Sequence, residues 1–345
     1  MKILAIESSC DETSASILEK TPQGMKVHAS VTATSLSLHA TTGGIIPENA
    51  ARMQVTYIMP VIIKALSDAF GNDSKIALKE NVDAIAVTFG PGLIGSLLVG
   101  VETAKTLAYS FNKPLIPVNH LLGHIYANFI DGIDKIEFPF IGLIVSGGHT
   151  DLLHFKNHGE YEWLGGTRDD AAGEAFDKIG RVLGLSYPAG PEIEKRAAKS
   201  NKHDIKFKSP LINEDNFDFS FSGLKTEAIR YYELHKKQKG DLQENDIDEI
   251  CYATQKAIVD VLIKKTLVAS EKFNCSTILI GGGVSANQTF INGIKEKAST
   301  MNIQVFSPPS MYCTDNAAMI GSYALLNHNP IEWKDVNANP ELYFG

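Results

Sequence analysis

Two histidines four residues apart, His120 and His124, are the residues of this sequence best suited to chemistry. They lie in the stretch NHLLGHIYANF (residues 119–129), whose apolar residues recur at helical spacing. Residues four apart in a helix share one face about one turn apart, so the two imidazoles could bind one metal ion. The next acid is Asp131, beyond the helix. We therefore expect a third ligand from a distant part of the chain.

Other interpretations of the same spacing exist. The two histidines could simply occupy a helix surface. A second pair, His154 and His158, lies in a predicted strand, turn and strand, where the shared face is lost. A zincin-type metallopeptidase needs a Glu directly after its first His as general base, and here that residue is Leu121. Peptidase chemistry of that type is therefore disfavoured.

Two glycine-rich stretches suggest close backbone approach. Gly90, Gly92 and Gly95 form GxGxxG between a predicted strand and a predicted helix. Pro91 removes one loop N–H, and no acid follows where a ribose-binding group belongs, so we interpret the pattern as a turn rather than a dinucleotide site. The stretch GGGVSANQ (281–288) lacks the Lys of a Walker loop, but its glycines could admit a flat ring or a phosphate at a helix N-terminus.

Composition excludes several classes of protein. The chain has 345 residues, 44% hydrophobic and 21% charged, which is enough for two cores. A signal-peptide pattern and a membrane-spanning apolar run are both missing, so we expect a cytoplasmic protein with no membrane association. Four scattered cysteines without a CxxC pair favour free thiols. The net charge of −8 argues against a generic nucleic-acid binder.

The elements that must position these residues form two similar series. The first predicts strands at KILAIES, TSASILE and GMKVHASVTAT, a helix from about Glu48 to Phe70, a strand at VDAIAVTF, a helix, a strand at PLIPV and the histidine helix. The second half repeats three strands, helix, strand, helix, strand, helix, from FIGLIVSGG to TDNAAMIGSYALL. This repetition implies a duplicated α/β unit with a cleft between the copies.

The repeat predicts two domains. We expect the first at residues 1–132, joined by the C-terminal helix and tail from about 325 to 345, and the second at 133–324. Residues from about 190 to 240 interrupt the second series. Within them, residues 195–239 contain eleven Lys or Arg and six acids, a net charge of +5. This basic insertion is our candidate for contact with nucleic acid, and an ordinary solvated surface is the alternative.

Eight motifs occur in order along nearly the whole chain: IESSCDETSASI, FGPGLIGSLLVG, NHLLGHIYA, IVSGGHT, DDAAGEAFDKIGRVLGLSYPAGP, FSFSGLK, GGVSANQ and CTDNAAMIG. Together they resemble the bacterial TsaD family, the tRNA N6-adenosine threonylcarbamoyltransferases formerly described as glycoproteases. The resemblance implies the ASKHA fold, a duplicated actin-like (RNase H-like) α/β arrangement of two domains around a central cleft. It also implies transfer of threonylcarbamoyl from threonylcarbamoyl-AMP to the N6 amine of the adenosine next to the anticodon, in tRNAs that read codons beginning with A, with release of AMP.

The resemblance implies site residues as well. One divalent ion would bind to His120, His124 and Asp315, with Fe²⁺ favoured and Zn²⁺ as the alternative. Because these ligands come from opposite ends of the chain, we expect the ion to bridge the two domains. The threonylcarbamoyl-adenylate would bind to Ile144, Val145, Ser146, Gly147, Gly148, Asp177, Gly190, Glu194 and Asn287.

Asp11 and Glu12, at the first strand tip, are our candidates for the general base. The family commonly has an aromatic before the glycines of an HxxxGG loop, and this chain has Thr42 there. The resemblance implies tRNA, an inactive paralogue of the TsaB type and an ATPase of the TsaE type as partners. Two alternatives stay open: a metal-dependent peptidase, and an ASKHA ATPase or chaperone-like protein.

Overall fold

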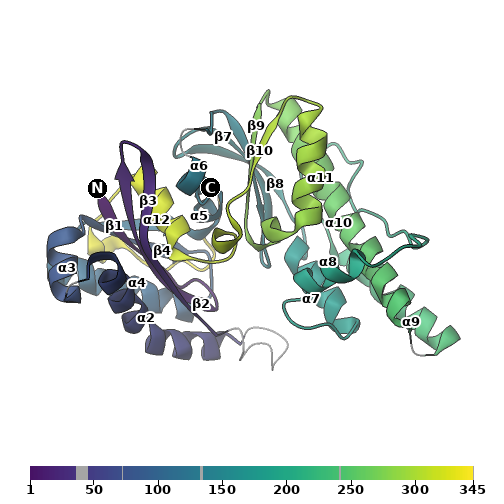
Figure 1. Ribbon diagram of the computed structural model, residues 1–345, viewed down its shortest axis with the longest axis horizontal. Helices are drawn as coiled ribbons and strands as arrows, with labels where there is room; N and C mark the ends of the chain where they lie inside the picture. The colour runs from purple at the N-terminus through teal and green to yellow at the C-terminus, as the bar shows by residue number, and fades with distance from the viewer. Residues whose placement is uncertain (36–45, 72, 133–134, 241, 345) are drawn as a thin grey trace. The chain divides into compact units, whose positions relative to one another are not determined.

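The structure, a computed structural model, divides the chain into two compact units (Figure 1). Unit 1 comprises Met1–Ile136 and Pro308–Gly345, and unit 2 comprises Glu137–Ser307. The structure describes residues 1–35, 46–71, 73–132, 135–240 and 242–344.

Unit 1 is built on a five-stranded sheet in the order β3-β2-β1-β4-β5. Strands β1, β4 and β5 run parallel, whereas β2 pairs antiparallel with β1 and β3. The strands are β1 (Lys2–Glu7), β2 (Glu12–Thr21), β3 (Gly24–Thr34), β4 (Ala84–Gly90) and β5 (Leu115–Asn119). The helices are α2 (Pro47–Phe70), α3 (Ser74–Asn81), α4 (Ile94–Phe111), α5 (His120–Tyr126), α6 (Phe129–Gly132) and α12 (Ala317–Leu326), with short 3-10 turns η2 (Ser310–Tyr312) and η3 (Trp333–Asp335).

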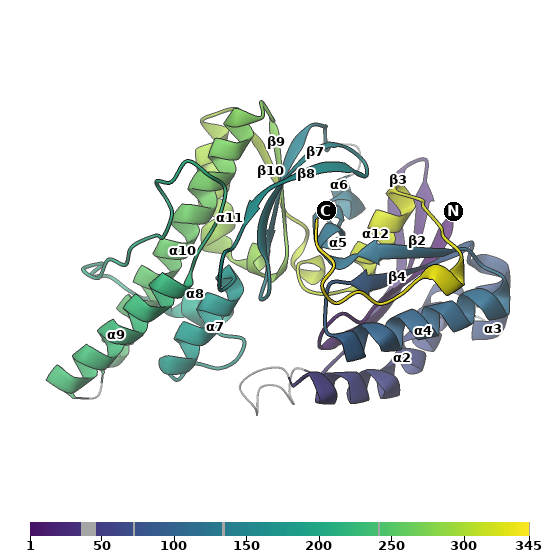
Figure 2. The same ribbon diagram turned by 180° about the vertical axis from the view of Figure 1, so that it is seen from behind.

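Strand β1 lies in the middle of the sheet, and both of its faces are apolar. Leu4 and Ile6 belong to the core that includes residues of α2 and α4, whereas Ile3 and Ala5 belong to the core that includes α12. Successive side chains of a strand point to opposite faces, so both sets are buried only if helices cover both sides of the sheet. Helices α2 and α4 cover one face and α12 the other (Figure 1, Figure 2).

Helix α12 belongs to unit 1, whereas the expected division assigned residues up to 324 to the second domain. It packs on β1, β2 and α5. Two glycines let α12 pack closely on these elements. A Cβ on Gly321 would lie 2.4 Å from Leu18 Cδ1, and one on Gly123 would lie 2.8 Å from Ile320 Cδ1. The sequence AAMIGSYALL has no polar face, so α12 is stable only where neighbours surround it.

Unit 2 repeats the connectivity of unit 1 in the order β10-β9-β6-β7-β8, which confirms the predicted duplication. Strand β6 is central, parallel to β9 and antiparallel to β7. The strands are β6 (Phe140–Val145), β7 (Thr150–Asn157), β8 (Glu160–Gly166), β9 (Thr277–Gly281) and β10 (Gln304–Phe306). The helices are α7 (Ala172–Val182), α8 (Gly190–Ala197), α9 (Ser222–Lys239), α10 (Glu244–Lys272), the 3-10 turn η1 (Gly283–Ala286) and α11 (Gln288–Ser299).

Two further expectations can be compared with the structure. Among the residues it describes, no helix is both long and apolar enough to cross a membrane. All four cysteines are free thiols, as their scattered positions predicted.

A candidate metal centre and a glycine-lined edge

The histidine helix begins where a parallel strand of unit 1 ends. Because β1, β4 and β5 run parallel, their carboxyl ends lie at one edge of the sheet, and the loops that follow them meet there. Helix α5 follows β5 without a break. The Asn119 side chain caps it by accepting a hydrogen bond from the Leu121 N–H at 2.8 Å. All seven residues of α5 are buried, so packing also holds the helix in place.

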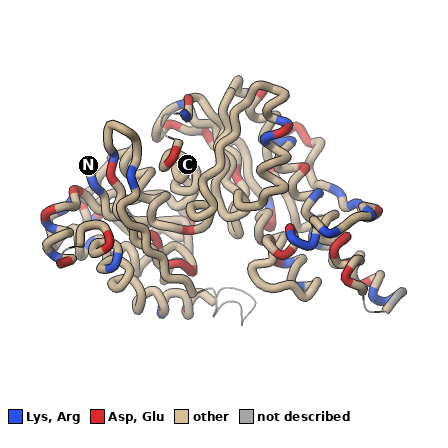
Figure 3. The backbone as a smooth tube through the Cα atoms, in the orientation of Figure 1, with Lys and Arg blue, Asp and Glu red and all other residues tan. Residues whose placement is uncertain are grey.

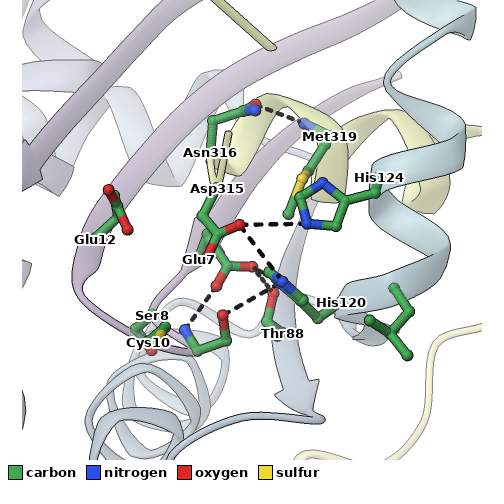
Figure 4. A network of polar contacts seen from close by, with 12 residues as sticks. Glu7, Ser8, Cys10, Glu12, Thr88, His120, His124, Asp315, Asn316 and Met319 are labelled. Atoms are coloured by element: carbon green, nitrogen blue, oxygen red, sulfur yellow. Dashed lines mark hydrogen bonds and ion pairs between the residues drawn. The ribbon is translucent and has the colours of Figure 1, made fainter. Parts of the chain in front are cut away.

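His120, His124 and Asp315 converge at this edge (Figure 4). Asp315 Oδ1 lies 3.3 Å from His124 Nε2 and 3.6 Å from His120 Nε2, and one ligand atom from each residue lies within 4.8 Å of the others. His124 is buried, and within the described part of the chain its ring nitrogens make no hydrogen bond; Asp315 lies beside Nε2 as a possible ion pair, and Nδ1 has no such contact. Buried polar atoms rarely lack a partner, so the three residues fit a bound cation.

Asp315 lies two residues before the start of α12, and the residue between them, Asn316, caps that helix. Asn316 caps α12 by accepting a hydrogen bond from the Met319 N–H at 3.0 Å, and its amide donates to Thr314 O at 2.7 Å. Since α12 packs on the sheet of unit 1, all three proposed ligands belong to that unit. The expectation that the ion bridges the two domains is therefore wrong: the ligands are distant in sequence but not in different units.

Glu7, which sequence reasoning missed, lies beside His120 at the end of β1 (Figure 4). Its Oε2 lies 3.1 Å from His120 Nδ1, and its Oε1 accepts a hydrogen bond from the Ser9 N–H at 2.6 Å. Burial alone would lower the pKa of His120, but the charges of Glu7 and Asp315 outweigh it and raise that pKa to about 9. Burial alone would raise the pKa of Glu7, but His120 holds it below its ordinary value.

Asp11 and Glu12, the candidate bases, lie next to the same centre. One carboxylate oxygen from each lies within 4.8 Å of the other and of an Asp315 oxygen. Burial, together with the charges of Asp315 and Asp11, raises the pKa of Glu12 to about 10. The two candidate bases and the three proposed metal ligands thus form one continuous cluster that shares Asp315.

The GxGxxG pattern serves close backbone approach, as predicted. A Cβ on Gly90 would lie 2.0 Å from Asn339 O, and one on Gly92 would lie 2.5 Å from Ser9 O. The Leu93 N–H donates to Ser9 O at 2.8 Å. The pattern therefore packs the loop after β4 against the loop after β1. The HxxxGG loop with Thr42 lies outside the described residues.

In unit 2 the equivalent edge is lined by glycines. Strands β6 and β9 are parallel and end at Val145 and Gly281, so the loops that follow are neighbours. A Cβ on Gly282 would lie 2.5 Å from Val145 O, and Gly282 has a φ of +95°, which side chains rarely adopt. A Cβ on Gly173, at the start of α7, would lie 2.6 Å from Ser146 O. Only glycine fits at either position.

Most of the expected adenylate residues gather around these loops. Ile144 and Val145 end β6, and Ser146, Gly147 and Gly148 follow them; Ser146 Oγ accepts hydrogen bonds from the Gly148 and His149 N–H groups at 3.4 and 3.1 Å. Nothing lies within 4 Å of a Cβ on Gly147 or Gly148.

Three other expected residues make structural hydrogen bonds. Glu194 Oε1 accepts from the Thr289 N–H at 3.0 Å, which ties α8 to the start of α11. The Asn287 side chain caps α11 and donates to Gln255 Oε1 at 2.9 Å. Asp177 lies on α7 and accepts from the Ala189 N–H at 2.7 Å, beside Gly190 at the start of α8, and burial raises its pKa.

The basic insertion forms α8, α9 and the segment between them. Figure 3 shows Lys and Arg along that segment and near the end of α9. Lys202, Lys206 and Lys208 are exposed. Two other cations are engaged: Arg196 pairs with Glu244 and Asp248, and Lys225 with Asp170. A cavity of about 710 Å³ lies between residues 202–207, α9 and the start of α10, away from the glycine loops.

Solved structures with this architecture show the class of fold. Full-length HypF in its phosphate- and nucleotide-bound form has a TM-score of 0.60 and 13% identity, and the match covers 95% of this chain and 55% of HypF. The activator of 2-hydroxyisocaproyl-CoA dehydratase from Clostridium difficile, with bound ADPNP, has a TM-score of 0.51 and 15% identity over 94% of each chain. The chain thus has the duplicated actin-like α/β fold that we expected.

The family follows from sequence comparison. A family model described as TsaD, tRNA N6-adenosine threonylcarbamoyltransferase, matches residues 26–322. A curated enzyme of that name from Moorella thermoacetica is 45% identical over 342 residues, which cover 99% of this chain and 96% of the relative. Another, from Clostridium botulinum, is 44% identical over 349 residues, 100% of this chain and 98% of the relative. The chain belongs to the TsaD family.

Proposed function

We propose that this chain transfers threonylcarbamoyl from threonylcarbamoyl-AMP to the N6 amine of the adenosine next to the anticodon, in tRNAs that read codons beginning with A. The amine nitrogen bonds to the carbamoyl carbon, the bond from that carbon to the phosphate oxygen breaks, AMP leaves with that electron pair, and the amine loses a proton. The observation that carries the proposal is the cluster of His120, His124 and Asp315 in a chain of the TsaD family.

One divalent ion would be held by these three residues. Imidazole nitrogens and a carboxylate suit Fe²⁺ and Zn²⁺ alike, and we propose Fe²⁺ because the family resemblance favours it. When bound, such an ion supplies Lewis-acid stabilisation of charge that develops on a substrate oxygen. The buried imidazoles and the short α5 keep the ligands in place before substrate arrives.

The proton of the attacking amine needs an acceptor. Burial and the Asp315 and Asp11 carboxylates raise the pKa of Glu12 to about 10, but the divalent ion proposed beside Asp315 would lower that pKa again. Asp11 and Glu12 are therefore both proposed acceptors, and Asp11 is the first to test. Replacing Asp11 by Asn should lower the transfer rate about 100-fold without loss of bound metal, because proton transfer by a positioned group contributes about that factor.

The adenylate would rest on the glycine-lined edge of unit 2. The open backbone at Gly147 and Gly148 admits a phosphate, and Gly282 lets the loop after β9 pack against Val145 at the same edge. Asp177, Gly190, Glu194 and Asn287 are the remaining proposed contacts, although the last two already hold α11 in place.

The tRNA would contact the basic insertion. Its net charge of +5 contrasts with −8 for the whole chain, and counterion release makes such a local positive surface the main source of affinity for phosphate backbones. Since its proposed substrate is tRNA, we also propose that the protein acts in the cytoplasm.

The proposed partners are an inactive paralogue of the TsaB type and an ATPase of the TsaE type. For the paralogue, unit 1 offers a row of exposed apolar residues four apart on α2, namely Val55, Met59 and Ile63, next to Ile94 and Leu98 on the adjoining α4. Contiguous exposed apolar side chains mark interaction surfaces. Changing Val55 and Met59 to Glu should abolish co-elution with the paralogue, whereas Glu at the exposed Val268 of α10 should not.

The decisive experiment supplies purified chain, the two partners, radiolabelled threonylcarbamoyl-AMP and tRNA. Label should enter tRNA in step with AMP release, and treatment with chelator should stop both. No observation favours the alternatives: Leu121 stands where a zincin-type peptidase has its Glu, and an aliphatic side chain cannot accept a proton. Peptide cleavage sensitive to chelator, or ATP hydrolysis independent of tRNA with no labelled tRNA, would refute the proposal.

A further inference from the structure

Glu7 is a buried carboxylate that the proposed reaction leaves without a role. It ends β1 at the centre of the unit 1 sheet, its side chain is 1% exposed, and the chain before it, from Ile3 to Ile6, is wholly apolar. A buried charge is strongly destabilising unless hydrogen bonds and opposite charge compensate it. A carboxylate at this position therefore needs an explanation beyond strand formation.

Three donors surround the Glu7 carboxylate (Figure 4). The Ser9 N–H donates to Oε1 at 2.6 Å, the Thr88 hydroxyl donates to Oε2, and His120 Nδ1 lies 3.1 Å from Oε2. The first belongs to the loop that carries Asp11 and Glu12, the second to β4, and the third to the metal centre. One side chain thus connects the three segments that meet at this edge.

Two oxygens lie beside His120 Nδ1, Glu7 Oε2 at 3.1 Å and Ser9 Oγ at 3.2 Å, and of the two only the carboxylate cannot donate. Glu7 therefore keeps a hydrogen on Nδ1, and the proton that an ion displaces from the ring is the one on Nε2. That leaves the lone pair on Nε2, the nitrogen that lies 3.6 Å from Asp315 Oδ1. Carboxylates that orient metal-binding histidines in this manner affect metal affinity without touching the metal.

We propose that Glu7 is the positioning residue of the metal centre: it fixes the ring of His120 with Nε2 towards Asp315 and holds the Asp11–Glu12 loop beside it. The proposal rests on the metal centre of the proposed function and adds a residue outside the ligand set. Neither the reaction nor the identity of the substrate enters it.

Glu7→Gln tests the proposal because an amide cannot satisfy all three donors. If its oxygen stays on the Ser9 N–H, its NH₂ faces His120 Nδ1 and favours the ring form with hydrogen on Nε2, which blocks the ion. If its oxygen turns to His120, the NH₂ faces the Ser9 N–H, donor against donor. We expect Zn²⁺ affinity, measured by chelator competition, to fall about 10- to 100-fold, and the visible absorption of bound Co²⁺ to change.

Two further variants separate positioning from packing. Thr88→Val keeps the volume of a buried side chain and removes one donor to Glu7, but leaves the acceptor at His120, so Zn²⁺ affinity should stay within about threefold. Glu7→Asp keeps a carboxylate, and its affinity should lie between those of wild type and Glu7→Gln; it also serves as the test if Glu7→Gln does not fold. Thermal unfolding of each variant reports folding separately from metal affinity.

The possible outcomes are distinct. A Glu7→Gln chain that folds and binds Zn²⁺ as wild type does would overturn the positioning role and leave the proposed function standing. Equal losses in Glu7→Gln and Glu7→Asp, or in Thr88→Val, would assign the effect to packing and overturn it as well. A wild-type chain that binds neither Zn²⁺ nor Co²⁺ would remove the metal centre itself, and with it both proposals.

Discussion

The two units place different residues at the equivalent edge of their two sheets. In unit 1, the central strand β1 ends in Glu7 and is followed by Asp11 and Glu12, and β5 is followed by His120. In unit 2, the central strand β6 is followed by Ser146, Gly147 and Gly148, and its parallel neighbour β9 ends in a run of glycines. The edge of unit 1 carries ionisable side chains, and the edge of unit 2 consists largely of glycines, which have no side chain.

If both proposed sites are right, the difference shows how a duplicated fold acquires two binding roles. In both units the connectivity brings the loops after parallel strands to one edge, whatever residues those loops contain. Side chains at that edge can bind a cation, whereas glycines leave room for a phosphate or a ring next to N–H groups. Function therefore depends on a few loop residues rather than on the sheet. If this division of roles is right, changes at one edge should spare the binding function of the other.

The largest expected effect comes from Asp315→Asn. The substitution keeps the shape and removes the charge that helps neutralise a divalent ion, so the protein should lose most bound metal and nearly all threonylcarbamoyl transfer. AMP should still bind within about tenfold of wild type, roughly 1.4 kcal/mol, because the proposed adenylate site belongs to unit 2. Elemental analysis, the transfer assay and calorimetry with AMP measure the three quantities.

His120→Ala should behave like Asp315→Asn. Near-normal transfer by a metal-free Asp315→Asn protein would show that the ion is not catalytic. A parallel loss of AMP binding would instead mean that the two edges are not independent.

The converse change is Gly282→Ala, which should damage only the edge of unit 2. At a φ of +95° and 2.5 Å from Val145 O, the new methyl group forces the loop after β9 to move. Affinity for AMP should fall at least about tenfold, and the free energy of unfolding should fall by about 1–3 kcal/mol. Metal content should not change. Gly283→Ala is the matched control, since nothing lies within 4 Å of its Cβ; equal losses of AMP affinity in both variants would contradict the steric argument.

Local sequence patterns predicted the strands and helices, but they did not predict contacts between residues that lie far apart in the chain. The repeated series of strands and helices followed from apolar periodicity, and the histidine pair from its spacing, because both are local patterns. Asp315 came only from the family resemblance. No local pattern relates it to a helix about 190 residues earlier in the chain.

Glu7 and α12 show what local patterns leave out. In the sequence, Glu7 looks like the polar end of a strand, and only its distance to His120 reveals a role. One signal could have identified it: it is a charged residue at the end of a wholly apolar strand. Helix α12 was grouped with the second series because it follows it in sequence. Its contacts, such as the Ala317 N–H with Ser14 Oγ at 3.0 Å, join residues about 300 positions apart.

A smaller effect is expected from the basic insertion of unit 2. Changing Lys202, Lys206 and Lys208 to Glu should weaken tRNA binding about tenfold at moderate salt and flatten its salt dependence, since each lost phosphate contact lowers the slope by about one. Binding of AMP and of metal should be unaffected. The charge-matched control reverses Lys26, Lys295 and Lys297, which are exposed elsewhere. Equal weakening by both triple variants would reduce the insertion to an ordinary charged surface.

The smallest expected effect concerns the attachment of α9 to unit 2. Asp169 accepts hydrogen bonds from the Phe221 and Ser222 N–H groups at 2.7 and 3.1 Å, and from the Ser220 and Ser222 hydroxyls at 2.6 and 2.7 Å. Burial alone would raise the pKa of Asp169, but these hydrogen bonds lower it overall. A lowered carboxyl pKa adds stability above the pKa of the unfolded chain, about 3.9, and that stability is lost as pH falls through the lower folded value.

Asp169→Asn should therefore lower the melting temperature by about 2–4 °C at pH 7, a small change because the carboxylate is exposed to solvent. The difference from wild type should shrink as pH falls below about 4. The Asp169 carboxyl of the unfolded wild-type chain then binds a proton, which stabilises the unfolded state, whereas Asn does not titrate. Glu160→Gln is the control: among the described residues this exposed carboxylate has no ion pair or hydrogen bond of its side chain, so little change is expected at any pH. Metal content should match wild type throughout. A difference that stays constant down to pH 3 would mean that the hydrogen-bonding shape of Asp169, and not its charge, holds α9 in place.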